Sequence, residues 1–390
     1  METLNNSSTQ LAIIIPTYRW NGLAKDVLTQ AASIGSGEIS VHIGDNSANS
    51  EKHAFLKDLA SRSTNVRVTC HSKNLGADNN WLYLVKAQTA PFICMAADDD
   101  CFGGTYYRTA LKLIREDANC GAAAGLLISI ANKPGQCAPF VLPAVERLET
   151  DPLGRIRKYH GNNVLCYAIA RRSVIRGFAD FVEANPLGCP FNDYMLAFHL
   201  LSIGTYRRDQ MGYVYLFDNS HWQLNDSFIE SNSLWYKGYG LPERFGYLTR
   251  LHWAVVAVHF FSSIYRSSDL STEQAEEIVC YLFNRQRNKF AQDYYRYRPV
   301  IDQLFSLDAG AAAACKRLMR EGYTSVDAIF DDFALVVAFF SPDVAQRYRE
   351  FQRTTLLQKL SSVRFSRPAF RLIFENTKET ILRRLGASAG

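Results

Sequence analysis

Short apolar runs alternate with amphipathic segments along the first half of the chain. Four of the runs have the length of buried strands, and their starts recur every 25–28 residues: Leu11–Ile15, Ile39–Gly44, Val66–Cys70 and Phe92–Ala96. The segments between them space their apolar residues as helices do: Leu23–Ala32, Glu51–Arg62 and Ala77–Gln88. Apolar strands that alternate with helices predict a Rossmann-like α/β fold, with a mostly parallel sheet covered by helices on both faces.

The middle of the chain continues this pattern with longer interruptions. The segment Ala131–Tyr159 carries four prolines and predicts a long loop. The other elements that we expect are a helix at Tyr106–Asp117, a strand at Gly121–Ile130, a strand at Val164–Ala170, a helix at Pro190–Ser202 and a pair of strands within Thr205–Phe217.

The pattern changes after Asn225. Long amphipathic stretches such as Gln274–Lys289 and Asp327–Phe340 dominate this part of the chain, and strand signals are few. We therefore expect two domains, an α/β domain over residues 1–225 and a helical domain over residues 226–390.

The composition is typical of a folded protein that stays inside the cell. Of the 390 residues, 47% are hydrophobic and 21% are charged, which is enough apolar material for a core. The nine cysteines include no Cys-x-x-Cys pair, which favours reduced thiols over a disulfide framework or a zinc site. The polar segment Met1–Gln10 is unlike a signal peptide, and no apolar run reaches the ~20 residues of a membrane-spanning helix. The sequence therefore predicts a cytoplasmic protein.

Charge is distributed unevenly along the chain. The net charge of +5 is too small to indicate nucleic acid binding, and we expect no nucleic acid partner. The segment Ser341–Gly390 carries ten Lys and Arg against four Asp and Glu, whereas the preceding residues are close to neutral. Within Arg353–Arg384 the basic residues alternate with apolar ones, as in helices that bind anionic membrane surfaces. We expect either peripheral binding at the inner face of the membrane or a packed helix with a solvated basic face.

Each of the four predicted parallel strands is followed by a polar cluster. The clusters are Pro16-Thr17-Tyr18-Arg19, Asp45-Asn46-Ser47, His71-Ser72-Lys73-Asn74-Leu75-Gly76 and Asp98-Asp99-Asp100. Ligands of open α/β sheets bind beyond the carboxyl ends of the strands, so we expect one cleft at this edge. The sequence contains neither a Gly-x-Gly-x-x-Gly nor a Walker A pattern, which argues against dinucleotide and P-loop chemistry.

The three adjacent carboxylates of Asp98, Asp99 and Asp100 indicate a cation site. Such groups repel one another and stay ionised most readily beside positive charge. Mg²⁺ or Mn²⁺ accepts one or two carboxylates together with diphosphate oxygens. The alternative is a solvated acidic turn that caps the helix expected near Gly104.

The order and spacing of these motifs resemble those of family 2-type glycosyltransferases of the GT-A fold, over roughly Leu11–Phe217. The matching motifs are Ile14-Ile15-Pro16-Thr17-Tyr18, Gly44-Asp45-Asn46-Ser47, Asn74-Leu75-Gly76, Asp98-Asp99-Asp100, Ala170-Arg171-Arg172-Ser173 and Phe191-Asn192-Asp193. Two positions depart from the family pattern. Ala97 stands where many members begin a longer acidic run, and Asn192 replaces the usual Glu beside Asp193.

The resemblance implies an inverting, divalent-metal-dependent glycosyltransferase. Such an enzyme moves a sugar from a nucleotide sugar, here with a UDP-sugar favoured, to a glycan or lipid-linked glycan. Asp193 is then the general base, and Asp45 accepts the N3–H of the nucleobase. The segment Gly161-Asn162-Asn163 either lines the acceptor side or forms an ordinary turn. The donor site comprises Pro16, Thr17, Tyr18, Arg19, Asp45, Asn74, Gly76, Asp98 and Asp99. The ligands of Mg²⁺ or Mn²⁺ are Asp98, Asp100 and His221, and Asp99 could take the place of either aspartate.

Two other functions stay open on the sequence alone. A sugar-phosphate nucleotidyltransferase has a similar sheet, but it uses a Gly-rich phosphate loop that Pro16-Thr17-Tyr18-Arg19 does not provide. A non-catalytic glycan-binding or scaffold protein could share the fold. The presence of Asp98, Asp100 and Asp193 together argues against that alternative.

Overall fold

The computed structural model describes residues 9–35, 37–131, 139–141, 146–158, 163–189, 192–218, 226–267, 271–319 and 326–354. The chain divides into two compact units. The sheet unit comprises Met1–Glu183 and Asn192–Gln223, and the helical unit comprises Ala184–Phe191 and Leu224–Gly390. Each unit has its own buried apolar core.

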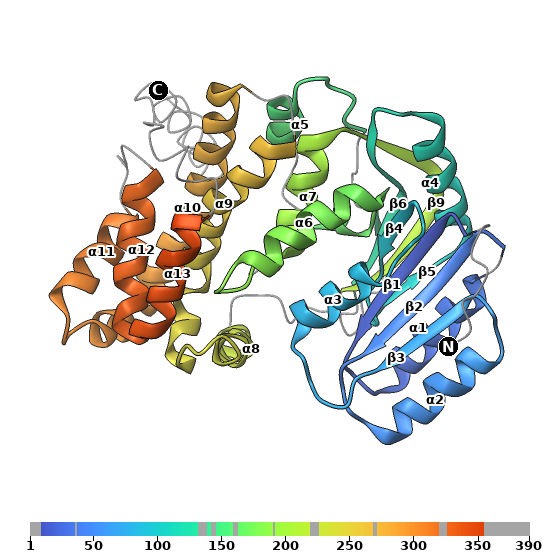
Figure 1. Cartoon of the computed structure of the whole chain (residues 1–390), viewed down its shortest axis with the longest axis horizontal. Coiled ribbons are helices and arrows are strands. Elements are labelled where there is room, and N and C mark those ends of the chain that lie inside the picture. Colours follow the sequence, from blue (N-terminus) through green and yellow to red (C-terminus); the bar gives the residue numbers. More distant parts are fainter. Residues whose placement is uncertain are drawn as a thin grey trace. The chain divides into compact units, whose positions relative to one another are not determined.

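One mixed sheet of nine strands forms the centre of the sheet unit in the described part of the chain (Figure 1). Eight strands lie side by side in the order β3-β2-β1-β4-β8-β6-β9-β5, and β7 pairs with β6. Their bounds are β1 Leu11–Thr17, β2 Ile39–Asp45, β3 Val66–Cys70, β4 Phe92–Met95, β5 Asp100–Phe102, β6 Cys120–Ala131, β7 Pro139–Val141, β8 Ile169–Arg171 and β9 Thr205–Asp218. The pairings give β1, β2, β3, β4, β6 and β9 one direction, so the prediction of a mostly parallel sheet is confirmed.

Helices cover both faces of this sheet. α1 (Gly22–Ile34) and α2 (Ser50–Ser61) lead from β1 to β2 and from β2 to β3, whereas α3 (Ala77–Lys86) returns from β3 to β4. Because such crossovers are right-handed, α1 and α2 lie on one face and α3 lies on the other (Figure 1). The remaining helices of this unit are α4 (Gly104–Glu116), α5 (Pro152–Lys158), α6 (Arg172–Ala184) and α7 (Asn192–Ile203).

Three local predictions were wrong in detail. The expected loop Ala131–Tyr159 contains β7 and α5, and the expected strand Val164–Ala170 begins as a 3-10 helix, Val164–Tyr167, before β8. The expected pair of strands in Thr205–Phe217 is the single long strand β9. Its register with β6 shifts between Ala124 and Leu126, so one continuous strand contains the irregularity.

The helical unit confirms the predicted C-terminal helical region. Its helices are α8 (Asp226–Lys237), α9 (Thr249–Ser267), α10 (Thr272–Leu304), α11 (Ala309–Met319), α12 (Val326–Phe340) and α13 (Pro342–Thr354), with a 3-10 helix at Glu243–Leu248. The rings of Tyr236, Phe245, His252 and Phe333 pack together in its core. Across the helices that the structure describes, none combines the length and apolar character needed to cross a membrane. Most of the basic segment Arg353–Arg384 lies outside the described residues.

The register of the parallel strands aligns their carboxyl ends. Thr17 at the end of β1 lies opposite Asp45 at the end of β2, and Asp45 lies opposite Cys70 at the end of β3. The polar residues that follow these strands therefore emerge at one edge, as the sequence predicted.

Close backbone contact between β6 and the start of β9 depends on two glycines. A Cβ on Gly204 would lie 2.6 Å from the amide nitrogen of Gly121 and 2.7 Å from the carbonyl oxygen of Asn119. We expect Gly204→Ala to lower the free energy of unfolding by about 1–3 kcal/mol, because backbone atoms cannot move aside as a flexible side chain can. Gly177→Ala on α6 is the matched control, since no atom lies within 4 Å of its added Cβ. Denaturant unfolding measures both, and equal stability of the two variants would contradict the close contact.

Candidate active site

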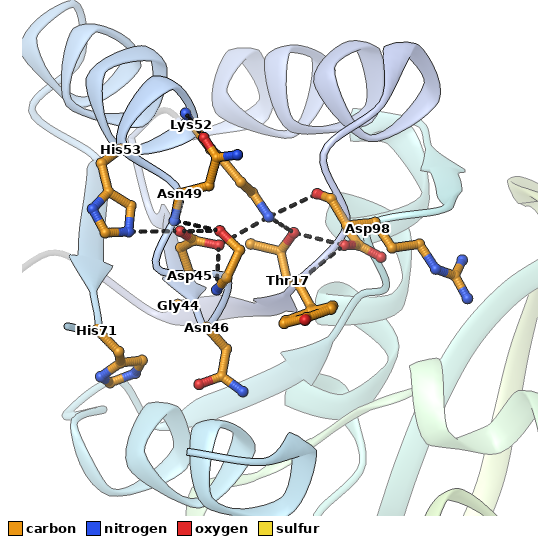
Figure 2. Close-up of polar contacts among 12 residues, drawn as sticks. Thr17, Gly44, Asp45, Asn46, Asn49, Lys52, His53, His71 and Asp98 are labelled. Carbon is orange, nitrogen blue, oxygen red and sulfur yellow. Dashed lines mark hydrogen bonds and ion pairs between the residues drawn. The ribbon is translucent and has the colours of Figure 1, made fainter. Parts of the chain in front are cut away.

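The carboxyl edge of the parallel strands brings most of the predicted donor-site residues together. Figure 2 shows Thr17, Asp45, Lys52 and Asp98 joined by a continuous set of polar contacts. Pro16 lies beside Thr17 in β1 and pairs with Gly44 of β2. The side chain of Tyr18 follows and is 58% exposed, so its ring is open to a ligand.

The end of β1 is connected directly to the acidic turn after β4. The hydroxyl of Thr17 donates a hydrogen bond of 2.6 Å to Oδ2 of Asp98, and the amide of Tyr18 donates to the same oxygen at 3.3 Å. The guanidinium of Arg19 pairs with Asp99 at 2.5 Å. Asp98 and Asp99 are only partly buried, so the ion pair and the Asp98 carboxylate both border solvent.

Asp45 stands where the sequence predicted, but its carboxylate is enclosed by protein. Its side chain has no exposed surface. Oδ1 lies 2.9 Å from Nζ of Lys52 and accepts from the amide of Ser47, while Oδ2 accepts from the hydroxyl of Ser47 at 2.9 Å. Nε2 of His53 also lies 2.9 Å from Oδ2 (Figure 2). A nucleobase N–H would have to displace one of these partners to reach Asp45.

Lys52 is a site residue that the sequence analysis missed. Its ammonium group donates to the Thr17 hydroxyl at 2.7 Å and to the Arg19 carbonyl at 2.8 Å, besides its contact with Asp45. The local cause is the first turn of α2, where the side chain of Asn49 caps the amide of Lys52. One signal was present in the sequence: Lys52 falls on the buried stripe of α2 together with Leu56 and Leu59.

The loop after β3 is held against the end of β2 by amide groups. Asn46 donates to Oδ1 of Asn74 at 2.6 Å and to the carbonyl of Gly76 at 3.2 Å, and it accepts from the amide of Leu75. Gly76 adopts a φ of +83°, which disfavours other residues, and α3 begins directly after it. Asn74 and Gly76 therefore shape the loop through Asn46, in the place that the sequence predicted.

Asp193 occupies the first turn of α7 and is partly buried. Burial raises the pKa of its carboxyl above the ordinary value, and hydrogen bonds from the Asn163 side chain and the backbone amides of Asp193 and Tyr194 work in the opposite direction. Nδ2 of Asn163 donates to Oδ2 at 2.5 Å. A carboxylate held in this way suits a proton acceptor.

Asp193 and Asp100 both form hydrogen bonds with the short segment 163–167, which contains the buried thiol of Cys166: Asp193 with Asn163, and Asp100 with Tyr167. Burial raises the pKa of Cys166 well above the ordinary value, and the charges of Asp193 and Asp100 raise it further. Asp100 is itself buried and forms a hydrogen bond with Tyr167, whose pKa is raised first by burial and then by this carboxylate. The acidic turn and α7 therefore contribute to one site.

Asn192, which replaces the family Glu, contacts a different carboxylate. Its side chain donates to Oδ1 of Asp78 at 3.0 Å, and Asp78 lies in the first turn of α3. Asp78 is 6% exposed, so this contact connects α3 and α7 beneath the surface of the site.

The three predicted metal-site carboxylates have different partners. Asp98 accepts from Thr17, Asp99 pairs with Arg19, and Asp100 bonds to Tyr167. Among the residues with described positions, no three His, Cys, Asp or Glu side chains are grouped so that they could hold a metal. His221 lies outside the described residues. A magnesium ion bound mainly through a diphosphate needs only one or two carboxylates, and the partly exposed Asp98 fits that requirement.

The raised pKa of Asp193 predicts a pH-dependent cost to stability. The folded protein holds this proton more tightly than the unfolded chain, so ionisation of Asp193 lowers stability as the pH rises above about 4. We expect the melting temperature of Asp193→Asn, relative to wild type, to increase between pH 4 and pH 7. Glu149→Gln is a control of opposite sign at lower pH: the hydrogen bond from Lys158 lowers the pKa of Glu149, so wild type should lose stability relative to this variant as the pH falls below about 4.5. Parallel pH profiles for the two variants would contradict the assignment.

Comparison with known proteins identifies the fold. The sequence matches no protein-family model and no curated protein. The crystal structure of S. aureus TarS 1–349 in complex with UDP-GlcNAc matches with a TM-score of 0.50 and 14% identity, over 89% of this chain and 91% of that chain. The same TarS fragment in complex with UDP gives a TM-score of 0.46 and 13% identity, over 95% of this chain and 92% of that chain. The likeness to the UDP-GlcNAc complex shows that this chain has the GT-A-type glycosyltransferase fold.

Proposed function

We propose that the protein is an inverting glycosyltransferase that transfers a sugar from a nucleotide sugar to a hydroxyl group of a glycan or lipid-linked glycan. The observation that carries this proposal is the position of Asp193. It is a partly buried carboxylate of raised pKa that accepts a hydrogen bond from Asn163, and Asp100 of the acidic turn bonds to Tyr167 in the same short segment. A base beside a diphosphate-binding edge is the arrangement that this reaction requires.

A UDP-sugar is the donor that we favour. A protein of the same fold has been crystallised with UDP-GlcNAc. In this chain the exposed ring of Tyr18 offers a surface for the nucleoside, and Arg19 beside it offers positive charge for the diphosphate. Pro16, Thr17, Asn74 and Gly76 would form the walls of the same site, and Asp45 would act from beneath it.

The chemistry assigned to Asp193 is proton removal. Its carboxylate takes the proton of the acceptor hydroxyl while the hydroxyl oxygen attacks the anomeric carbon from the side opposite the diphosphate. The bond between that carbon and the diphosphate oxygen breaks, and the diphosphate leaves with the electron pair. Attack from the opposite side inverts the configuration of the sugar. Asn163 orients the base through its hydrogen bond to Oδ2.

Mg²⁺ or Mn²⁺ is the cofactor that we propose. Asp98 would hold it together with the donor diphosphate, and Asp100 and His221 remain candidates for further ligands. When bound, such a cation neutralises the charge that the leaving diphosphate acquires.

The acceptor and the location of the enzyme are further parts of the proposal. We expect a cytoplasmic enzyme whose basic C-terminal segment, Arg353–Arg384, binds the anionic inner face of the membrane. Such binding would bring the site close to a lipid-linked glycan.

A donor screen tests the function directly. The full chain is incubated with UDP-, GDP-, dTDP- and CMP-sugars, in Mn²⁺ or in EDTA, and nucleotide release is measured. We expect release from one donor, most favourably a UDP-sugar, with loss of activity in EDTA. Asp98→Ala and Asp193→Asn should each lower the rate at least ~100-fold, because each removes a group that acts in the transition state.

Lys86→Met is the matched control for these variants, since Lys86 on α3 forms an exposed ion pair with Glu183 on α6. Its rate should equal that of wild type. Release that persists in EDTA would contradict the metal requirement. If no donor is bound or cleaved, the non-catalytic alternative is favoured, whereas a product of sugar-phosphate activation would favour a nucleotidyltransferase.

The pH dependence of transfer tests the base and its partner. The hydrogen bond from Asn163 lowers the pKa of Asp193, so its removal raises that pKa further. We expect the acid limb of the kcat/KM profile to move to higher pH in Asn163→Ala. Asn65→Ala, between α2 and β3, is the control and should leave the profile unchanged. An acid limb that stays in place in Asn163→Ala would show that Asp193 is not the group that titrates.

A further inference from the structure

The ammonium group of Lys52 has no contact with solvent and uses its full bonding capacity. Its side chain is 0% exposed. An ammonium group has three N–H donors, and three oxygens surround it: the Thr17 hydroxyl, the Arg19 carbonyl and a carboxylate oxygen of Asp45. Figure 2 shows Lys52 reaching from α2 to the end of β1. A buried lysine is tolerated when it is paired in this manner.

The contact with Lys52 determines how the Thr17 hydroxyl is oriented. A hydroxyl has one proton to donate, and its lone pairs accept. Because Lys52 donates to Oγ1 of Thr17, the proton of Thr17 is available for Asp98, whose Oδ2 lies 2.6 Å away. Lys52, Thr17 and Asp98 thus form a directed chain of hydrogen bonds.

We propose that Lys52 is a positioning residue that orients the Asp98 carboxylate through Thr17. The inference rests on the proposed function and adds a division of tasks within the donor site. Lys52 orients the Asp98 carboxylate, which faces the diphosphate, through Thr17. The same ammonium group forms the ion pair with Asp45. Loss of Lys52 should therefore weaken recognition of the diphosphate and leave recognition of the nucleoside intact.

The test has to separate positioning from folding. Lys52→Met alone leaves the Asp45 carboxylate buried without its countercharge, which should lower the melting temperature by about 10 °C. The double variant Lys52→Met/Asp45→Asn removes both charges and should recover most of that loss. Thr17→Val removes the hydroxyl that connects Lys52 to Asp98 and leaves the ion pair between Lys52 and Asp45 in place. Thr17→Ser preserves the hydroxyl.

The probes are UDP and uridine, titrated into the full chain in Mn²⁺. We expect the UDP affinity of Lys52→Met/Asp45→Asn and of Thr17→Val to fall by about 10- to 100-fold. The loss of uridine affinity should be smaller than the loss of UDP affinity in both variants, and in Lys52→Met/Asp45→Asn it should be no larger than in Asp45→Asn alone. Combining the Lys52, Asp45 and Thr17 substitutions should add no further loss, since all act through Asp98. Thr17→Ser should retain most of the UDP affinity, and the exposed control Lys86→Met should retain both affinities.

Equal losses for UDP and uridine, or no loss for either, would overturn the positioning role. Additive losses in the combined variant would overturn it as well. If wild type binds UDP but releases nucleotide from no donor, the proposed function fails, while the two affinities still decide the role of Lys52. A wild-type chain that binds neither probe contradicts both proposals.

Discussion

The ion pair between Lys52 and Asp45 fixes the geometry at the carboxyl edge of the sheet. Neither side chain contacts solvent, and an isolated charge in this place would be strongly unfavourable. The pair forms only when α2 is seated on the ends of β1 and β2, with Asn49 capping the helix at the same point. Helix docking, strand pairing and the orientation of the acidic turn therefore depend on one another.

The protonation of Asp193 on α7 depends on burial and hydrogen bonding rather than on an ion pair. Asp193 is only partly enclosed, and burial opposes its charge while three hydrogen-bond donors favour it. Asp45, by contrast, is committed to partners within its own turn and helix. Two carboxylates near one edge of the sheet thus have separate tasks: one stabilises the framework, and the other is suited to proton transfer.

The alternation of apolar runs and helices was enough to predict the parallel strands, because those elements are specified by local periodicity. The polar clusters after the strands could be predicted for the same reason. Lys52 was missed although it falls on the buried stripe of α2, since a lysine in the first turn of a helix is usually solvated and two of its partners lie 33 and 35 residues away. The single long strand β9 was expected as two strands, because a shift of register with β6 has no local signal in the sequence. The enclosure of Asp45 likewise depends on α2 docking.

Cys166 has a consequence beyond packing. The thiol is 2% exposed, and the charges of Asp100 and Asp193 add to the effect of burial on its ionisation. A cation that binds near these carboxylates, or a proton on Asp193, removes part of that repulsion and makes the thiolate easier to form. Because the thiol is buried, a small alkylating reagent would reach Cys166 only when this part of the fold opens. The rate at which Cys166 is alkylated would therefore measure how often the structure around it opens.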